Sequence, residues 1–227
     1  MWLRRNAPIS DRVDAGNQLA SDQRLQKYAG RGTDTIILAL PRGGVPVAFE
    51  MAKKLKVPLD LMLVRKLGIP FHEETAMGAI AMGGVTYVNE EFVSSLGISN
   101  AEVQRVIRKE TEELHRRSKH YRGNKPYPIL ADKNVIIVDD GIATGATLRA
   151  AIQAVKQFNP KQVIAAVPVG ARDSCRDLAQ VADEMICLHQ PEPFNAVGLW
   201  YESFPQTEDE EVMELLRKAE QFGKREE

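Results

Sequence analysis

The sequence predicts an α/β protein with a doubly wound, mainly parallel sheet, and two observations support this prediction. Short, continuous apolar runs recur along the chain, which is the pattern of strands buried on both faces. Between them lie stretches whose apolar residues repeat every three or four positions, the period of an amphipathic helix. Strands and helices that alternate in this way form parallel units. Ligands of such sheets bind beyond the carboxyl ends of the strands, so the turns after strands should carry the site.

The apolar runs give the strands of the predicted sheet. They lie at 35–40, 59–64, 135–138, 163–169 and 185–188, with a further strand-like run at 85–88. The stretch 65–84 contains several glycines and prolines, and we interpret it as a long connector.

Capping signals and helical periodicity mark the segments between the strands. A helix is expected over 11–29, and another begins at Pro46, where the missing N–H costs nothing. Ser99 and Glu102 form a capping box for a long helix that ends near Tyr121. Three later helices are expected: from about Thr144, around 175–182, and after a cap made by Thr207 and Glu210.

Length and composition limit the class of protein. We interpret 1–227 as a single domain with a core of about 30–190. The 30 basic and 31 acidic residues leave a net charge of −1, which argues against nucleic-acid binding. No apolar run approaches the ~18 residues of a membrane span, and residues 1–8 do not resemble a signal peptide, so a cytoplasmic protein without membrane contact is expected. Cys175 and Cys187 lie outside C-x-x-C spacing, and two buried thiols fit a reducing compartment.

The strongest chemical signal is the segment 135–147, with the sequence VIIVDDGIATGAT. A buried strand ends in Asp139 and Asp140, and a turn of small residues then leads into a helix. Small residues let backbone N–H groups approach a ligand, and the helix N-terminus adds positive potential, which suits a phosphate dianion. The carboxylates would repel a phosphate, whereas vicinal hydroxyls or a hydrated Mg²⁺ suit them. Because ribose 5-phosphate offers phosphate and diol together, the segment predicts a ribose-phosphate site.

This segment resembles the ribose-phosphate signature of type I phosphoribosyltransferases, which it matches over thirteen residues without a gap. The resemblance covers about 35–190. It implies an enzyme that binds 5-phosphoribosyl-1-pyrophosphate (PRPP) and Mg²⁺, transfers ribosyl 5-phosphate to a nitrogenous base and releases pyrophosphate. By the same resemblance, Asp139 and Asp140 hold the ribose hydroxyls and, through water or the ligand, the metal. The implied 5-phosphate residues are Ala143, Thr144, Gly145, Ala146 and Thr147.

Two further segments resemble loops of this family. Arg65 and Lys66 are similar to the start of the mobile loop of orotate and adenine phosphoribosyltransferases, although Ile69 replaces the second lysine of that pattern. Residues 65–84 would then be a lid, and the basic pair would take part in catalysis by binding the leaving pyrophosphate. The turn after the first strand resembles the family's pyrophosphate loop. The family often keeps a cis peptide in this loop; if one is present here, it would lie between the first two residues, and the sequence leaves its presence open. That loop consists of Pro41, Arg42, Gly43 and Gly44.

The acceptor is the least determined part of this interpretation. Family members bind it under a hood, which we place in 1–30, in 190–227, or in both. Ala143 stands where hypoxanthine-type enzymes carry an aspartate base, which argues against a 6-oxopurine acceptor. The candidate base-stacking residues are Phe194, Trp200 and Tyr201, with packing of the last helix on the core as the alternative. The candidate acid or base residues are Glu73, Glu74 and Glu202.

Other functions remain open from the sequence. A PRPP-binding regulatory protein would keep the ribose-phosphate site and bind a partner, for which the helix at 99–121 is available. The neutral net charge and the lack of a helix-turn-helix pattern speak against DNA as that partner. A ribose-phosphate hydrolase, or a kinase similar to PRPP synthetase, is a weaker alternative, and the chain is too short for the synthetase's two lobes. The resemblance also implies a homodimer.

Overall fold

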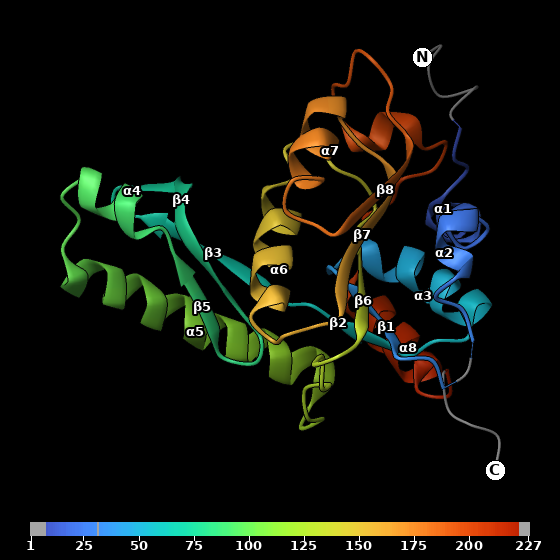
Figure 1. Cartoon of the computed structure of the whole chain (residues 1–227), viewed down its shortest axis with the longest axis horizontal. Helices are drawn as coiled ribbons and strands as arrows, with labels where there is room; N and C mark the ends of the chain where they lie inside the picture. The colour runs from blue at the N-terminus through green and yellow to red at the C-terminus, as the bar shows by residue number, and fades with distance from the viewer. Residues whose placement is uncertain (1–7, 31, 223–227) are drawn as a thin grey trace.

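The computed structural model describes residues 8–30 and 32–222, and its centre is a parallel sheet with the strand order β2-β1-β6-β7-β8 (Figure 1). All four pairings in this sheet are parallel. The predicted α/β fold with a doubly wound, mainly parallel sheet is therefore confirmed. The strands are β1 (Thr35–Ala39), β2 (Leu59–Leu61), β6 (Asn134–Val138), β7 (Gln162–Val169) and β8 (Glu184–His189).

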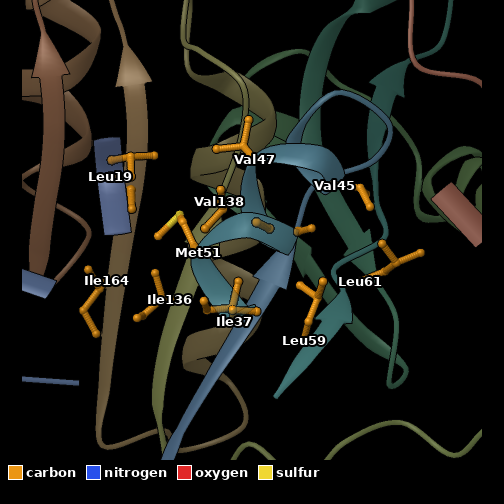
Figure 2. Packing of buried hydrophobic residues seen from close by; sticks show 14 of the residues in the cluster. Leu19, Ile37, Val45, Val47, Met51, Leu59, Leu61, Ile136, Val138 and Ile164 are labelled. Atoms are coloured by element: carbon orange, nitrogen blue, oxygen red, sulfur yellow. The ribbon is translucent and has the colours of Figure 1, made fainter. Parts of the chain in front are cut away.

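Alternate side chains of the strands enter two separate hydrophobic clusters, one on each face of the sheet. Ile37 and Ile136 belong to the cluster that also contains Leu19 and Met51 (Figure 2). Helices α1 (Arg12–Ala20), α3 (Gly44–Leu55) and α8 (Asp209–Ala219) contribute to this first cluster. Helices α6 (Ala146–Lys156) and α7 (Arg172–Leu178) contribute to the second, which includes the neighbouring residue Ile137. Both faces are buried, so the strands need the continuous apolar runs seen in the sequence.

The prediction of a long connector at 65–84 is wrong, because these residues form most of a second, antiparallel sheet. Its strands are β3 (Val64–Ile69), β4 (His72–Ala81) and β5 (Val85–Val88), in that order. The glycines and prolines mark turns and a close strand contact rather than an irregular loop. A Cβ on Gly78 would lie 2.1 Å from the carbonyl oxygen of Tyr87, so only glycine lets β4 and β5 approach at this point. The expected strand at 85–88 is confirmed.

Two helices connect the small sheet to the rest of the chain. Helix α4 (Glu90–Ser95) is followed by α5 (Asn100–Arg122), which runs from the small sheet back towards α8 (Figure 1). The predicted capping box is present. The backbone N–H of Ser99 donates to the Glu102 carboxylate, and the backbone N–H of Glu102 donates to the Ser99 hydroxyl.

Two helix predictions need correction. The helix expected over 11–29 is divided into α1 and the short α2 (Gln23–Gln26), because Asp22 begins a new helix by accepting a hydrogen bond from Arg24 N. The last helix begins after Glu208, so Thr207 is not its cap; Thr207 is instead buried. Cys175 and Cys187 are both buried and free, as expected.

The two terminal segments of the described chain lie side by side. Ile9 pairs with Tyr201 in an isolated bridge, and the backbone N–H of Glu202 donates to Ile9 O at 2.9 Å. The outermost parts of the predicted hood, 1–7 and 223–227, lie outside the described residues. None of the helices in the described ranges combines the length and the apolar character that a membrane crossing requires.

Candidate active site

The predicted phosphate turn lies between the carboxyl end of β6 and the N-terminus of α6. Gly145 precedes the helix with φ +72°, a conformation that glycine adopts without strain. The N-cap residue Gly145 offers no side-chain cap, and Ala146 N donates to Thr144 Oγ1 only at a long 3.5 Å, so the first N–H groups of α6 are available to an anion. Thr144 and Thr147 are exposed beside them. The helix begins at Ala146 rather than near Thr144, which leaves more of the turn for a ligand.

Asp139 is the first of the two carboxylates that follow β6. Its Oδ1 accepts a hydrogen bond from the backbone N–H of Asp140 at 2.9 Å. Burial, and then repulsion from the Asp140 carboxylate, raise the pKa of Asp139 well above its usual value. A perturbed carboxylate at a strand end is a common mark of a functional site. A cationic ligand placed here would favour the ionised form of Asp139.

Asp140 is held by a residue that the sequence analysis missed. Arg12, on α1, donates to Asp140 Oδ2 from Nε at 2.9 Å and from Nη2 at 2.7 Å. The guanidinium also lies 3.9 Å from the centre of the Phe204 ring and donates to Pro205 O. These contacts join α1, the β6 turn and the C-terminal segment at one carboxylate. No sequence signal marks Arg12, which lies 128 positions away from Asp140.

The predicted pyrophosphate loop packs directly against the two carboxylates. A Cβ on Gly43 would lie 1.9 Å from Asp140 Oδ2, and one on Gly44 would lie 2.6 Å from Val138 O. Both glycines are therefore required by close approach to the β6 turn. The peptide between Pro41 and Arg42 is cis, which answers a question that the sequence left open, at the position where the resemblance would place such a bond. Helix α3 starts at Gly44, so the N–H groups of its first turn lie in this loop.

The basic pair of the small sheet lies beside the phosphate turn. Arg65 Nε and Nη2 each contact Glu110 Oε2 of α5 at 2.7 Å, whereas Lys66 is exposed. Both residues line a cavity of about 360 Å³ that also includes Thr147. The structure thus places the pair next to the predicted 5-phosphate residues, and Arg65 already has an acidic partner.

The predicted base-stacking residues separate into two groups. Phe194 and Trp200 have nearly parallel rings, with an interplanar angle of 18° and centroids 6.5 Å apart. The Trp200 Nε1 atom is buried and has no hydrogen-bond partner within the described ranges. Tyr201 requires a correction, because it is fully buried and its hydroxyl donates to Asp140 O at 2.6 Å. Its ring is therefore part of the core and is not available to stack on a base. Its hydroxyl instead holds the backbone of Asp140.

The remaining predicted residues are less informative. Glu202 is exposed next to this segment, and the side chains of Glu73 and Glu74 are outside what the structure describes. Within 8–30 and 32–222, no group of three or more His, Cys, Asp or Glu residues is placed to hold a metal ion. Mg²⁺ commonly uses only one or two protein carboxylates together with water and substrate phosphates. Asp139 and Asp140 fit that more limited role.

Comparison with known proteins identifies the family. Residues 9–199 match the model of the phosphoribosyl transferase domain. Two proteins of Mycobacterium tuberculosis, from strains H37Rv and CDC 1551, carry the provisional name of phosphoribosyl transferase. Each is 46% identical over 211 residues, covering 93% of this chain and 47% of the relative. The chain belongs to the phosphoribosyl transferase domain family, a family of pentosyltransferases, which confirms the resemblance.

A solved structure shares both the fold and part of the sequence. The crystal structure of TT1426 from Thermus thermophilus is 35% identical, with a TM-score of 0.82 over 92% of this chain and 98% of that chain. The mycobacterial relatives are longer proteins, and this chain spans about half of their length. The family membership alone therefore does not define the activity or the substrates of this chain.

Proposed function

We propose that this protein is a phosphoribosyltransferase that binds PRPP with Mg²⁺ and transfers ribosyl 5-phosphate to a nitrogenous base. The observation that carries the proposal is the contact between the two predicted loops. Gly43 of the pyrophosphate loop lies against the carboxylate of Asp140, and the open N-terminus of α6 follows that aspartate along the same turn. Phosphate, diol and pyrophosphate groups would thus meet complementary partners within one continuous surface.

The reaction would break the bond between the anomeric carbon and the pyrophosphate oxygen and form a bond from that carbon to a base nitrogen. Pyrophosphate leaves with the electron pair, and the nitrogen loses its proton to a base or to water. The transition state resembles an oxocarbenium ion, which the negative charges of Asp139 and Asp140 would stabilise. Bound Mg²⁺ would neutralise charge on the departing pyrophosphate. The chain's own contribution is positioning and electrostatics, and it needs no protein nucleophile.

The raised pKa of Asp139 supports this mechanism. Without a ligand, burial and Asp140 oppose its ionisation. Positive charge that develops on the ribose would reverse that preference, so the interaction is strongest in the transition state. Arg12 would hold the Asp140 carboxylate in one orientation by binding Oδ2 twice. The other carboxylate oxygen would then accept hydrogen bonds from the ribose.

The test is pyrophosphate release from PRPP and Mg²⁺ with a panel of bases, compared with the double variant Asp139→Asn/Asp140→Asn. Release with one base that disappears in the variant is the expected result. PRPP binding without release for any base would contradict the transferase proposal and favour a PRPP-binding regulatory protein. If PRPP does not bind at all, the proposed site is wrong.

Location and assembly extend the proposal on the family resemblance alone. We propose a cytoplasmic homodimer. Light scattering of the purified chain would measure the molecular mass in solution, and cell fractionation would measure the location. A monomeric mass, or recovery with a membrane fraction, would contradict this extension without affecting the proposed reaction.

A further inference from the structure

A second cavity of about 360 Å³ lies beside the predicted pyrophosphate loop. It is formed by the C-terminal half of α5, the N-terminus of α8 and the loop residue Pro41. We call it the α5 cavity. Its charged and polar lining residues are Arg42, Arg116, Arg117, His120, Tyr121 and Asp209. Three arginines and one aspartate line it, and Glu113 and Glu208 lie within 3.6 Å of these arginines.

The arginines of α5 share one acidic partner. Glu113 contacts both Arg116 and Arg117 at 2.7 Å. The two guanidinium groups together have more N–H donors than one carboxylate can satisfy. Their side chains are 67% and 45% exposed, so the remaining donors are accessible to a ligand in the cavity.

Asp209 is the internal anion of the α5 cavity. It accepts a hydrogen bond from Tyr121 Oη at 2.5 Å and lies 3.3 Å from His120 Nε2. Arg42 Nη1 lies 3.6 Å from the same carboxylate. Groups from α5 and from the pyrophosphate loop thus surround one carboxylate. A bound anion in the same place would be surrounded by the same groups. Arg42 Nη1 also lies 3.6 Å from Glu208 Oε2. Both contacts are too long for good hydrogen bonds, which leaves that guanidinium available to a larger anion.

Arg42 connects the α5 cavity with the proposed active site. It belongs to the loop whose Gly43 contacts Asp140, while its side chain lines the α5 cavity. A pyrophosphate group attached to a ribose at Asp140 would therefore extend along the pyrophosphate loop into the α5 cavity. Arg65, the residue expected to bind the leaving group, is instead paired with Glu110 and lines a different cavity beside Thr147.

We propose that the α5 cavity binds a pyrophosphate group in competition with the Asp209 carboxylate. Arg116, Arg117 and His120 are then the pyrophosphate-binding residues that the small sheet was expected to supply. Guanidinium groups bind phosphate oxygens in a bidentate fashion, and a pyrophosphate has enough oxygens to contact Arg42 and α5 together. The assignment of this group to PRPP rests on the proposed function, whereas binding of free pyrophosphate does not.

The experiment is calorimetric titration of inorganic pyrophosphate and of PRPP into the wild-type chain and four variants. Arg116→Ala/Arg117→Ala should weaken pyrophosphate binding at least about tenfold, because charge-assisted hydrogen bonds are lost. Asp209→Asn should strengthen it several-fold by removing the competing carboxylate. Arg176→Ala is the matched control, since Arg176 is also 67% exposed and also pairs with an acid three residues away. Asp139→Asn/Asp140→Asn should lose PRPP binding, which tests the proposed function separately.

Each result has a defined meaning once thermal melting shows that the variants are folded. Equal pyrophosphate affinity of the wild type and the double arginine variant would overturn the proposed cavity. Weaker binding by Asp209→Asn would overturn the competition. If the arginine variant binds PRPP as tightly as the wild type, but pyrophosphate weakly, the cavity binds only free pyrophosphate and its role in PRPP binding is overturned. Loss of PRPP binding in the Asp139/Asp140 variant supports the proposed function in all these cases, so the two proposals fail separately.

Discussion

Arg12 and Asp140 form an ion pair of 2.7 Å at the point where α1 meets the turn after β6. Their side chains are only 10% and 16% exposed, so water screens the pair weakly. Tyr201 binds the backbone carbonyl of the same aspartate at 2.6 Å. One residue of the candidate site is thus fixed by both terminal segments of the chain, which links the stability of those segments to the geometry of the site.

Replacing Arg12 should therefore affect stability and ligand binding together. Arg12→Ala leaves a largely buried carboxylate without its partner, which typically costs about 3–5 kcal/mol of unfolding free energy. PRPP affinity should fall as well, because Asp140 loses its fixed orientation. Arg12→Lys keeps the charge without the planar fork, so it should recover only part of both losses. Urea denaturation and PRPP titration measure the two effects, and an Arg12→Ala variant as stable as the wild type would contradict the argument.

The parts of the site that follow strands could be predicted from the sequence. Asp139, Asp140 and Gly145 lie close to one another in the chain, so their pattern already contains their spatial relationship. Gly43 could also be placed at the predicted site, because the carboxyl ends of neighbouring parallel strands meet at one edge of the sheet. Arg12 could not, since its contact with Asp140 depends on how α1 packs across the sheet.

The small sheet shows a different reason for failure. Glycine and proline at 65–84 are equally compatible with an irregular loop and with tight hairpins. What distinguishes the two is burial of alternate side chains, and Leu67 and Met77 are fully buried between the strands and their neighbours. Tyr201 illustrates the same limit for function. Its aromatic ring suits a stacked base or a core, and only the position of its hydroxyl at Asp140 O decides between them.

Gly43→Ala should disturb the site without straining the backbone. The added Cβ would meet Asp140 Oδ2 at 1.9 Å, and the carboxylate has little freedom to move because Arg12 holds it. We expect PRPP affinity to fall about tenfold or more, with a stability loss of about 1–3 kcal/mol from overpacking. Titration with PRPP measures the first effect.

Gly97→Ala is the control for this substitution. Gly97 has open space around its Cβ position and φ +64°, so alanine there costs only about 1 kcal/mol of backbone strain. It should leave PRPP affinity unchanged. Equal affinities of Gly43→Ala and Gly97→Ala for PRPP would show that the contact between the two loops does not matter for binding.

Arg122 should be the residue that fixes α5 to the main sheet. It binds Asp60 of β2 in a bidentate pair of 2.8 Å contacts, and the two side chains are 3% and 7% exposed. Arg122→Ala should lower the unfolding free energy by about 3–5 kcal/mol, because it leaves a buried charge unpaired. Arg122→Met combined with Asp60→Asn removes both charges and should lose clearly less. Arg176→Ala, which breaks an exposed pair, should cost under about 1 kcal/mol. Chemical denaturation of the three variants tests this order.

Asp139→Asn should stabilise the protein at neutral pH while it abolishes PRPP binding. Burial and the neighbouring Asp140 raise the pKa of Asp139 above the value of 3.8 expected in the unfolded chain. The folded state therefore binds this proton more tightly, and the resulting stability is fully present below pH 3.8. It is lost as the pH rises through the folded-state pKa, so the wild type carries a destabilising charge at pH 8 that asparagine lacks.

The melting temperature of Asp139→Asn should exceed that of the wild type at pH 8, and the difference should shrink as the pH is lowered to 5. A difference that stays constant would contradict the raised pKa of Asp139. A less stable variant at pH 8 would mean that Asp139 is stabilised as an anion by groups in the unliganded site. The expected result would instead show a carboxylate kept at a cost in stability, as is common where function requires an unfavourable charge.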